Sequence, residues 1–179
     1  MDDQLGAHPD LDPAAAAMRA EWREEQDAAT ADAAEAKHRR MTVRDRFEEH
    51  MHRGDRLAVI AAGQRLVGVP EEIGDDFVAL RTLSGRVDVH LTPSVPIYFE
   101  IYERAASGGD RGVDAAGSFV NALVRHEGDR EVTLGTVFDA DGIDGRINVG
   151  ADHVVLIGRA GAETVIPLAQ VSWVSARRE

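Results

Sequence analysis

The chain has 179 residues, a mass of 19.4 kDa and a formal net charge of −12. Apolar residues make up 44% and aromatic residues 5%, so the core of one domain, or of two very small ones, has to be built from Val, Ile, Leu and Ala. The acidic balance excludes a broadly basic surface for nucleic acid, and the absence of cysteine excludes disulfides, thiolate catalysis and Cys-ligated metal sites.

The first segment, 1–41, is an acidic, Ala-rich head that is expected to be helical. Asp12 and Pro13 form a helix start signal, and neither Gly nor Pro interrupts the following residues as far as Arg40. The apolar stripe is thin and includes Met18 and Trp22. Two interpretations stay open, a solvated helix and a partner-binding arm that uses these two side chains. Heptads are absent, which argues against a long coiled coil.

A second, shorter helix is predicted over 42–53. Thr42 is a suitable N-cap and Gly54 ends the segment. Val43, Phe47 and Met51 follow one another at a spacing of four residues, which predicts one buried stripe.

From residue 55 the apolar pattern becomes strand-like. Short runs rich in Val and Ile, separated by Gly or Pro, predict strands at 57–69, 76–83, 86–91 and 95–101. A Gly-rich linker is expected over 104–117 and a third helix over 118–127. Strands are predicted again at 130–139, 145–150, 153–158, 163–168 and 171–176.

Residues 97–102 alternate as in a strand with one buried face. The side chains expected to face a core are those of Ile97, Phe99 and Ile101. Tyr98 and Tyr102 then face outward, onto the other half of the chain or onto a partner. Trp173, on the last strand, is interpreted as a core residue, with an interface aromatic as the alternative.

The two halves of the chain repeat each other. Residues 74–80 match residues 150–156 at an offset of 76, and the same offset pairs Val89 with Val165 and Ile97 with Trp173. The short helices predicted at the start of these halves end alike, in the sequences Gly54-Asp55-Arg56 and Gly128-Asp129-Arg130. Gly68 and Gly145 fall at equivalent places inside strands, where a glycine marks a sharp bend.

The sequence contains no complete motif for catalysis or metal binding. The run 139–145 lacks the residues that a calcium loop requires, so Asp141-Gly142 is interpreted as a hairpin turn, with a weak cation site as the alternative. Two pairs of acids around an expected turn are interpreted as a solvated loop: Glu71-Glu72 and Asp75-Asp76. The histidines are expected at surface or half-buried positions. We therefore expect no enzyme, no catalytic residue, no metal and no cofactor.

Each half reads as a helix followed by five short strands, and the pattern of 132–171 resembles the Sm-like small barrel. The resemblance covers roughly 42–103 and 115–175 and implies a mainly β (α+β) fold. That fold has two Sm-like five-stranded bent barrels in tandem, each preceded by a short helix, plus the long N-terminal helix. The implied domains are the head 1–41, a first barrel 42–103, the linker 104–117 and a second barrel 118–179. The whole chain also resembles small proteins of GC-rich Gram-positive bacteria that are often labelled "Fis family transcriptional regulator". The residues give that label no support, because the last 70 contain no basic helix-turn-helix.

The resemblance does not carry the RNA pocket of the Sm family. That pocket uses an Asp and an Asn after the bent strand and an Arg-Gly pair in the last turn. In the second half these positions fall on Val149, His153 and Leu168-Ala169, of which only His153 is able to stack on or bond to a base. In the first half they fall on Ile73, Phe77 and Thr92-Pro93.

The expected function is therefore that of a non-catalytic interaction or regulatory module that binds a protein. Its candidate partner contacts are Met18, Trp22, Tyr98 and Tyr102. The alternative is a regulator of transcription or RNA that touches nucleic acid through a local Arg face, with the candidates Arg39, Arg40, Arg44, Arg46 and His153. With no leader and no long apolar stretch, a soluble, cytoplasmic protein without membrane contact is expected. Fusion of two barrels leaves at most two free sheet edges, so we expect a monomer or a dimer.

Overall fold

The structure, a computed structural model, describes residues 11–92, 94–106, 108, 113–114, 117–128, 131–139 and 141–176. These residues fall into two compact units that divide between Thr42 and Val43. Pro93, Asp129 and Arg130 lie outside the described ranges, as do residues 107, 109–112 and 115–116 of the expected linker.

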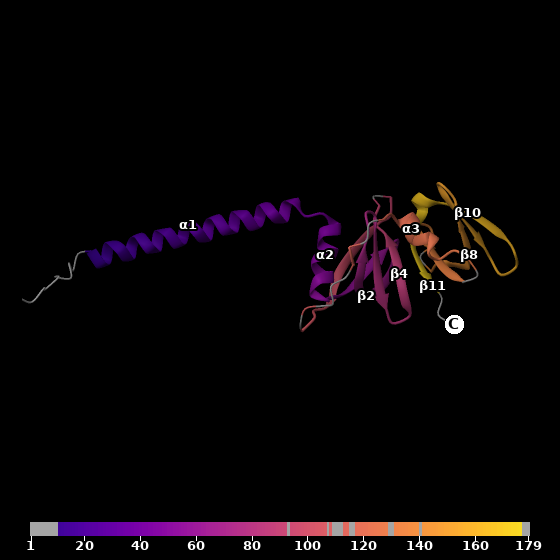
Figure 1. The fold of residues 1–179 in the computed structure, drawn as a ribbon, viewed down its shortest axis with the longest axis horizontal. Coiled ribbons are helices and arrows are strands. Elements are labelled where there is room, and N and C mark those ends of the chain that lie inside the picture. The colour runs from indigo at the N-terminus through magenta and orange to yellow at the C-terminus, as the bar shows by residue number, and fades with distance from the viewer. Residues whose placement is uncertain are drawn as a thin grey trace, which may run out of the picture. The chain divides into compact units, whose positions relative to one another are not determined.

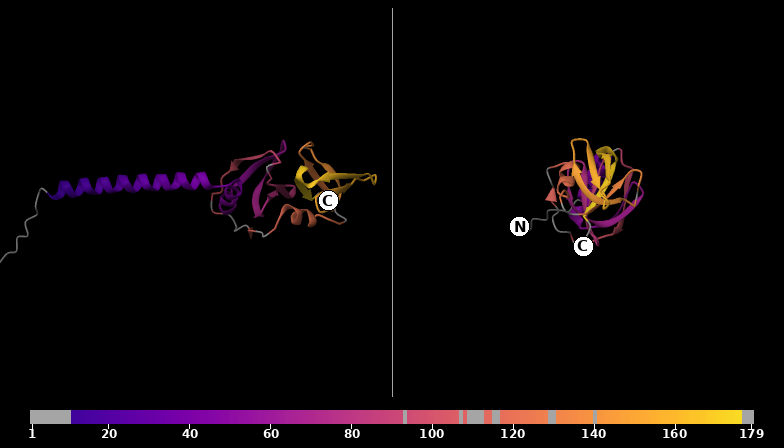
Figure 2. Two further views of the ribbon diagram at one scale, coloured as in Figure 1. Left: turned by 90° about the horizontal axis from the view of Figure 1, so that it is seen from above. Right: turned by 90° about the vertical axis from the view of Figure 1, so that its right-hand side faces the viewer.

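The first unit contains α1 (Leu11–Arg40), one unbroken helix of 30 residues (Figure 1, Figure 2). Its Ala, Glu and Arg residues favour helix, and its last turn is basic, which complements the helix dipole. Every described side chain from residue 15 to 40 is exposed, including Met18 at 70% and Trp22 at 62%. The predicted helix is confirmed, and its two large apolar side chains lie open to solvent.

The second unit contains two short helices. In α2 (Val43–Arg53) Phe47 and Met51 are buried as predicted. The prediction was wrong for Val43, which is 53% exposed because it lies at the very start of the helix. α3 (Phe119–Val124) ends three residues before the predicted boundary, because residues 126 and 127 donate to carbonyls only three positions back and tighten the chain into a turn.

The second unit is mainly β, as predicted. Its strands are β1 (Arg56–Ala61), β2 (Gln64–Ile73), β3 (Phe77–Thr82), β4 (Gly85–His90), β5 (Ile97–Glu103), β6 (Val113–Asp114), β7 (Val132–Thr136), β8 (Ile143–Val149), β9 (His153–Ile157), β10 (Glu163–Pro167) and β11 (Val171–Ala176), with a 3₁₀ turn, η1 (Leu168–Gln170), before the last. All but β6 join antiparallel in the order β10-β9-β8-β7-β11-β4-β3-β2-β1-β5. The sheet is open, since among the described strands β5 pairs only with β1 and β10 only with β9.

The expected linker is not wholly irregular. Val113 and Asp114 form β6, which pairs parallel with Glu72 and Ile73 of β2. Their pairing with β2 was not foreseeable from the Gly-rich composition, because a two-residue strand has no periodicity of its own.

The same strand order occurs twice along this sheet. The first half reads β5-β1-β2-β3-β4 and the second reads β11-β7-β8-β9-β10. The halves join where β4 pairs antiparallel with β11, with Trp173 opposite Val89, Val174 opposite Asp88 and Ser175 opposite Val87. We call this pair of strands the junction.

The register of the strands corrects two equivalences drawn from the fixed offset. In the hairpin of β3 and β4, Val89 lies opposite Val78, whereas in that of β9 and β10 Ile166 lies opposite Val154. Because residues 78 and 154 match at the offset of 76, the counterpart of Val89 is Ile166 and not Val165. The segment between the paired residues is one residue longer in the second hairpin, from Val154 to Ile166, than in the first, from Val78 to Val89, and this shifts the offset.

The counterpart of Trp173 is likewise shifted by one residue. Leu57 lies opposite Gly68, and Tyr98 lies opposite Ile60, which is three positions after Leu57. In the second half Val132 lies opposite Gly145, and Trp173 lies opposite Gly135, which is three positions after Val132. Tyr98, rather than Ile97, therefore occupies the position of Trp173.

Two hydrophobic clusters meet at the junction. One fills the second half but includes Phe77 and Ala79 from β3 of the first half. The other fills the first half, with Phe47 and Met51 from α2, but includes Trp173 from β11 of the second half. Each half thus contributes side chains to the core of the other, which couples their folding.

Gly68 and Gly145 are the points at which β2 and β8 pass from one neighbouring strand to the next. A Cβ atom at Gly68 would lie 2.8 Å from the carbonyl oxygen of Arg81, and one at Gly145 would lie 2.7 Å from that of Ile157. Both contacts are with backbone, which cannot rotate away.

We expect Gly68→Ala and Gly145→Ala to lower the free energy of unfolding by similar amounts, about 1–3 kcal/mol each, through overpacking. Gly108→Ala is the control, because a Cβ atom at Gly108 would meet no other atom within 4 Å. Urea denaturation monitored by circular dichroism measures all three. Two losses that differ widely, or a loss as large at Gly108, would contradict the equivalence of the two glycines.

Candidate interaction site

Strand β5 forms one open end of the sheet and carries exposed aromatic side chains. Tyr98 is 59% exposed and Tyr102 is 53% exposed, so neither covers the other half of the chain. Ile97 and Phe99 pack against the first core as predicted. Ile101 does not and is 40% exposed, and it precedes a bulge in β5: Ile101 pairs with Leu57 and Glu103 with Arg56, so Tyr102 is the extra residue. The unpaired amide and carbonyl groups of such an edge are a template for another strand.

Two guanidinium groups lie close to the ring of Tyr102. The guanidinium carbon of Arg56 is 5.2 Å from the centre of the Tyr102 ring, and that of Arg65 is 5.4 Å from it. Both distances are within the range of a cation–π contact. Arg56 also lies 3.9 Å from Glu103, so the end of the edge carries both signs of charge.

The same position in the second half is covered. Trp173 of β11 is only 4% exposed, because β4 pairs alongside it and Val87 and Val89 join it in the first core. Tyr98, its counterpart on β5, has no such neighbour among the described strands. β5 is therefore the equivalent of a strand that the fold covers elsewhere.

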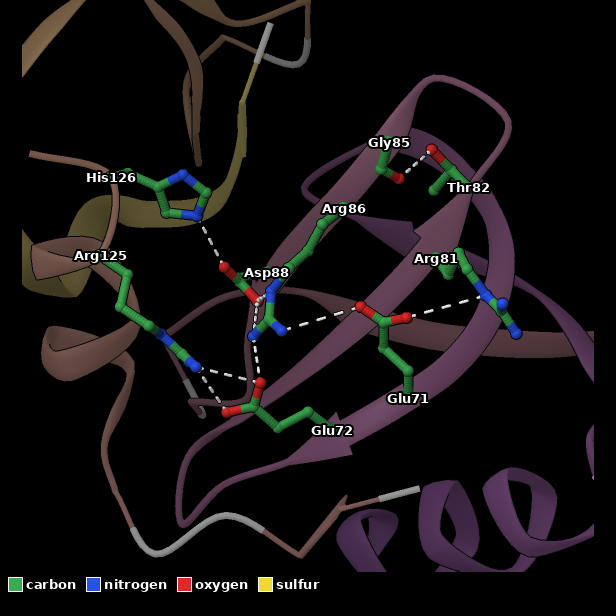
Figure 3. Close-up of polar contacts among 9 residues, drawn as sticks. All are labelled: Glu71, Glu72, Arg81, Thr82, Gly85, Arg86, Asp88, Arg125 and His126. Atoms are coloured by element: carbon green, nitrogen blue, oxygen red, sulfur yellow. Dashed lines mark hydrogen bonds and ion pairs between the residues drawn. The ribbon is translucent and has the colours of Figure 1, made fainter. Parts of the chain in front are cut away.

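An ionic network around the buried Asp88 joins the turn after α3 to the strands of the first half (Figure 3). Asp88 of β4 is fully buried, and its two carboxylate oxygens accept from Nε of Arg86 at 2.9 Å and from Nε2 of His126 at 2.7 Å. Arg125 donates to Glu72 of β2 at 2.8 Å. Since Arg125 and His126 follow α3, these contacts fix the end of that helix against the strands of the first half.

Arg86 connects the two carboxylates of this network. Burial acts to lower its pKa, but the hydrogen bond to Asp88 and the charge of Glu72 outweigh burial and hold the pKa above its ordinary value. Both partners keep the guanidinium charged. The network is thus an ion-pair cluster in which the buried Asp88 has two partners.

This network was not predicted from the sequence. Glu72 was expected in a solvated loop, but β2 extends to Ile73 and buries Glu72 to 8% exposure. His126 was expected at the surface or half-buried and is 7% exposed, because the early end of α3 turns it toward Asp88. One signal was present: Asp88 stands between two valines in a strand, where a charge needs a buried partner.

The expectation for the histidines was also wrong for His50, which is 6% exposed and whose Nδ1 lies 2.9 Å from Asp55. A third buried histidine, His90, lies near the other end of the junction. Its ring stacks on Phe119 at 4.3 Å, and its Nδ1 lies 3.0 Å from the carbonyl oxygen of Val171. Burial lowers its pKa below the ordinary value, against the opposing effects of the Val171 carbonyl and of Asp76. The folded protein therefore disfavours the charged form of this ring.

This shift predicts how stability changes with pH. A histidine whose pKa is lower in the folded protein than in the unfolded chain stabilises the fold at pH values above the unfolded pKa of about 6.5. This stabilisation is lost as the pH falls from about 6.5 toward the folded pKa. We expect the free energy of unfolding to fall below about pH 6.5 and His90→Gln, which keeps a donor for Val171, to flatten that decline. Urea denaturation at a series of pH values measures both. An unchanged slope in the variant would show that His90 does not cause the decline.

The structure pairs most of the arginines predicted to contact nucleic acid with protein acceptors. Arg39, in α1, lies 2.6 Å from Glu35, and Arg40 is exposed in the last turn of that helix. In the second unit, Arg44 donates to the Gly74 carbonyl at 3.0 Å.

The remaining two candidates on the second unit have acidic neighbours. Arg46 lies 3.0 Å from Glu49. His153, in β9, is half-buried and lies 2.8 Å from Asp152. Each carboxylate offsets the positive charge that a phosphate would require.

A pocket of about 390 Å³ lies over the junction. Its lining comes from both halves and consists of Gln64, Leu66, Ser84, Val87, Thr133, Trp173, Ser175 and Ala176. None of these side chains is charged, so the pocket offers no cation to a phosphate.

Within the described ranges, no three His, Asp or Glu side chains gather in a way that would hold a metal ion. None of the helices in those ranges is both long and apolar enough to span a membrane.

No family of known proteins, no curated protein and no solved structure matches the chain. The resemblance to Sm-like barrels and to tandem-barrel proteins of Gram-positive bacteria therefore stays a prediction.

Proposed function

We propose that the chain is a non-catalytic, cytoplasmic interaction module, built from a duplicated Sm-like small barrel, that binds a protein partner at the open edge of β5. The observation that carries the proposal is the contrast between Tyr98 and Trp173. They occupy equivalent positions, yet Trp173 is 4% exposed and Tyr98 is 59% exposed.

The duplication is supported by the strand order, which is the same in both halves, and by the equivalent positions of Gly68 and Gly145. In each half the glycine lies where a strand leaves one neighbour for the next, as a small bent barrel requires. Neither half closes on itself by hydrogen bonds among the described strands, since β4 pairs with β11 and not with β5.

The partner that fits is an extended protein segment. Strand addition uses main-chain hydrogen bonds for affinity and alternate side chains for specificity. At the junction, β4 runs antiparallel to β11 and places Val89 beside Trp173. A partner strand on β5 is accordingly expected to run antiparallel and to place an apolar side chain beside Tyr98.

The alternative, a regulator that touches nucleic acid, is favoured by one feature, the two guanidinium groups around Tyr102. Aromatic side chains beside arginine are a common platform for single strands. The net charge of −12 opposes it. We expect binding to short RNA and DNA to be weaker than roughly 10⁻⁵ M at ~150 mM salt, as for non-specific contacts.

A capture experiment from native lysate, with and without nuclease, tests the proposal. The bait is the full chain, beside Tyr98→Asp and a control, Leu83→Asp, which changes an 86% exposed residue of the turn between β3 and β4. We expect a captured protein that survives nuclease, is lost with Tyr98→Asp and is retained with Leu83→Asp. Capture that disappears with nuclease, or that is indifferent to Tyr98→Asp, would overturn the proposal.

A further inference from the structure

The pocket over the junction lies on one face of three neighbouring strands. Ser175 of β11 lies opposite Val87 of β4 on one side and opposite Thr133 of β7 on the other. Residues opposite each other in antiparallel strands share a face of the sheet, and so do residues two positions apart in one strand, which places Trp173 on this face as well. Because Ser175 is the smallest of these four residues, it leaves space at the centre of the row.

Two glycines make room for the indole that forms one wall of this pocket. A Cβ atom at Gly142 would lie 3.0 Å from Cη2 of Trp173, and a Cβ atom at Gly135 would overlap Nε1 of the same ring. Glycine at both positions lets the ring lie close to the backbone of β7 and of the turn before β8. The pocket therefore has an aromatic wall whose place is set by the backbone.

The lining of the pocket is uncharged, and one of its polar side chains has no protein partner. The Ser84 hydroxyl lies 3.0 Å from the Thr82 hydroxyl, and the Thr133 hydroxyl donates to Asp144 at 2.7 Å, so both are engaged. The side-chain amide of Gln64, at the start of β2, is half-buried and makes no hydrogen bond to any described residue. It has both donors and an acceptor to offer to a ligand.

We propose that this pocket binds a small, uncharged molecule that carries a carboxamide group on an apolar body. Its volume of about 390 Å³ is within the range of small-molecule sites, which combine apolar walls with a few polar groups. A carboxamide is able to pair with the Gln64 amide through two reciprocal hydrogen bonds. The apolar body would then pack against Leu66, Val87 and Trp173.

Charge decides which class of ligand the pocket takes. An ionised ligand would leave water without meeting an opposite charge, because no lining side chain is charged. The net charge of −12 opposes anions further. None of the lining residues belongs to β5, so this site is separate from the proposed partner edge and its test is independent of that proposal.

Three probes of nearly the same shape test the preference for an uncharged ligand: benzamide, which is neutral, benzoate, which is an anion, and benzamidine, which is a cation. The full chain with Trp22→Phe keeps Trp173 as its only tryptophan, so its fluorescence reports on the pocket. We expect benzamide to change this fluorescence saturably with a Kd of about 1 mM, ordinary for so small a ligand. Benzoate and benzamidine should bind at least about tenfold more weakly. No saturable response to benzamide, or an equal response to all three probes, would overturn the inference.

Gln64→Glu places a carboxylate of the same size in the pocket. We expect this variant to bind benzamide about tenfold more weakly, because one of the two hydrogen bonds loses its donor, and to bind benzamidine more tightly. Gln26→Glu is the control, since it makes the same change in α1, which contributes nothing to the pocket, and it should bind as the parent chain does. Ser175→Leu fills the space at the centre of the row and should abolish the response to benzamide. An unchanged order of the three probes in Gln64→Glu, or undiminished benzamide binding in Ser175→Leu, would show that the ligand does not lie in this pocket.

Discussion

Trp173→Ala is expected to lower the free energy of unfolding by about 3–5 kcal/mol, the range for removing a buried Trp from a core. The side chain is 4% exposed and lies in the core of the first half although it belongs to the last strand of the second. Its indole Nε1 has no hydrogen-bond partner among the described residues, so the loss comes from packing alone. Urea denaturation measures the change.

Tyr98→Ala is the matched control, because Tyr98 holds the equivalent position on the open edge and is 59% exposed. The free energy of unfolding is expected to fall by less than about 1 kcal/mol in this variant, since the Tyr98 side chain buries little apolar area. Equal losses for the two variants would mean that β4 does not cover β11 and that the junction is wrongly placed.

Asp88→Ala is expected to cost about 2–3 kcal/mol, because it leaves the buried His126 without its carboxylate and leaves the half-buried Arg86 with Glu72 as its remaining partner. Asp88 is fully buried and lies within 2.9 Å of both partners. Arg159→Ala is the control. It breaks the ion pair with Glu131, in which the Arg159 side chain is 67% exposed, and should cost under about 1 kcal/mol. Thermal or urea unfolding that found Asp88→Ala no more destabilising than Arg159→Ala would contradict the network.

Much of the local structure could be predicted because it follows from short-range patterns. Ala, Glu and Arg without Gly or Pro predict α1, and the spacing of Phe47 and Met51 predicts the buried face of α2. The hairpin of β7 and β8 forms as expected, with Gly142 at φ +81°, but its innermost pair is Leu134 with Ile143, so the connection is longer than a two-residue turn at Asp141-Gly142. These features depend on residues that are close together in the chain.

The arrangement of the halves could not be predicted in the same way. Strand periodicity tells which face a residue takes, but not which strand lies beside it. The pairing of β4 with β11 joins residues 84 positions apart, such as Val89 and Trp173. A fixed offset also matched Trp173 with the wrong counterpart, because turns of different length shift the register by one residue.

The network around Asp88 illustrates the same limit. Its members come from β2, β4 and the turn after α3. Glu72 and His126 are 54 positions apart in the chain and carry no shared motif. Only the three-dimensional arrangement shows that each buried charge has a partner.

Amide hydrogen exchange tests most directly the claim that β5 is the uncovered counterpart of β11. In dilute protein the amides of β11 should exchange slowly, because this strand lies between β4 and β7. The amides of β5 that are not bonded to β1 should exchange rapidly and become protected when a partner strand binds. Slow exchange of those β5 amides in the isolated chain, or rapid exchange throughout β11, would contradict the account.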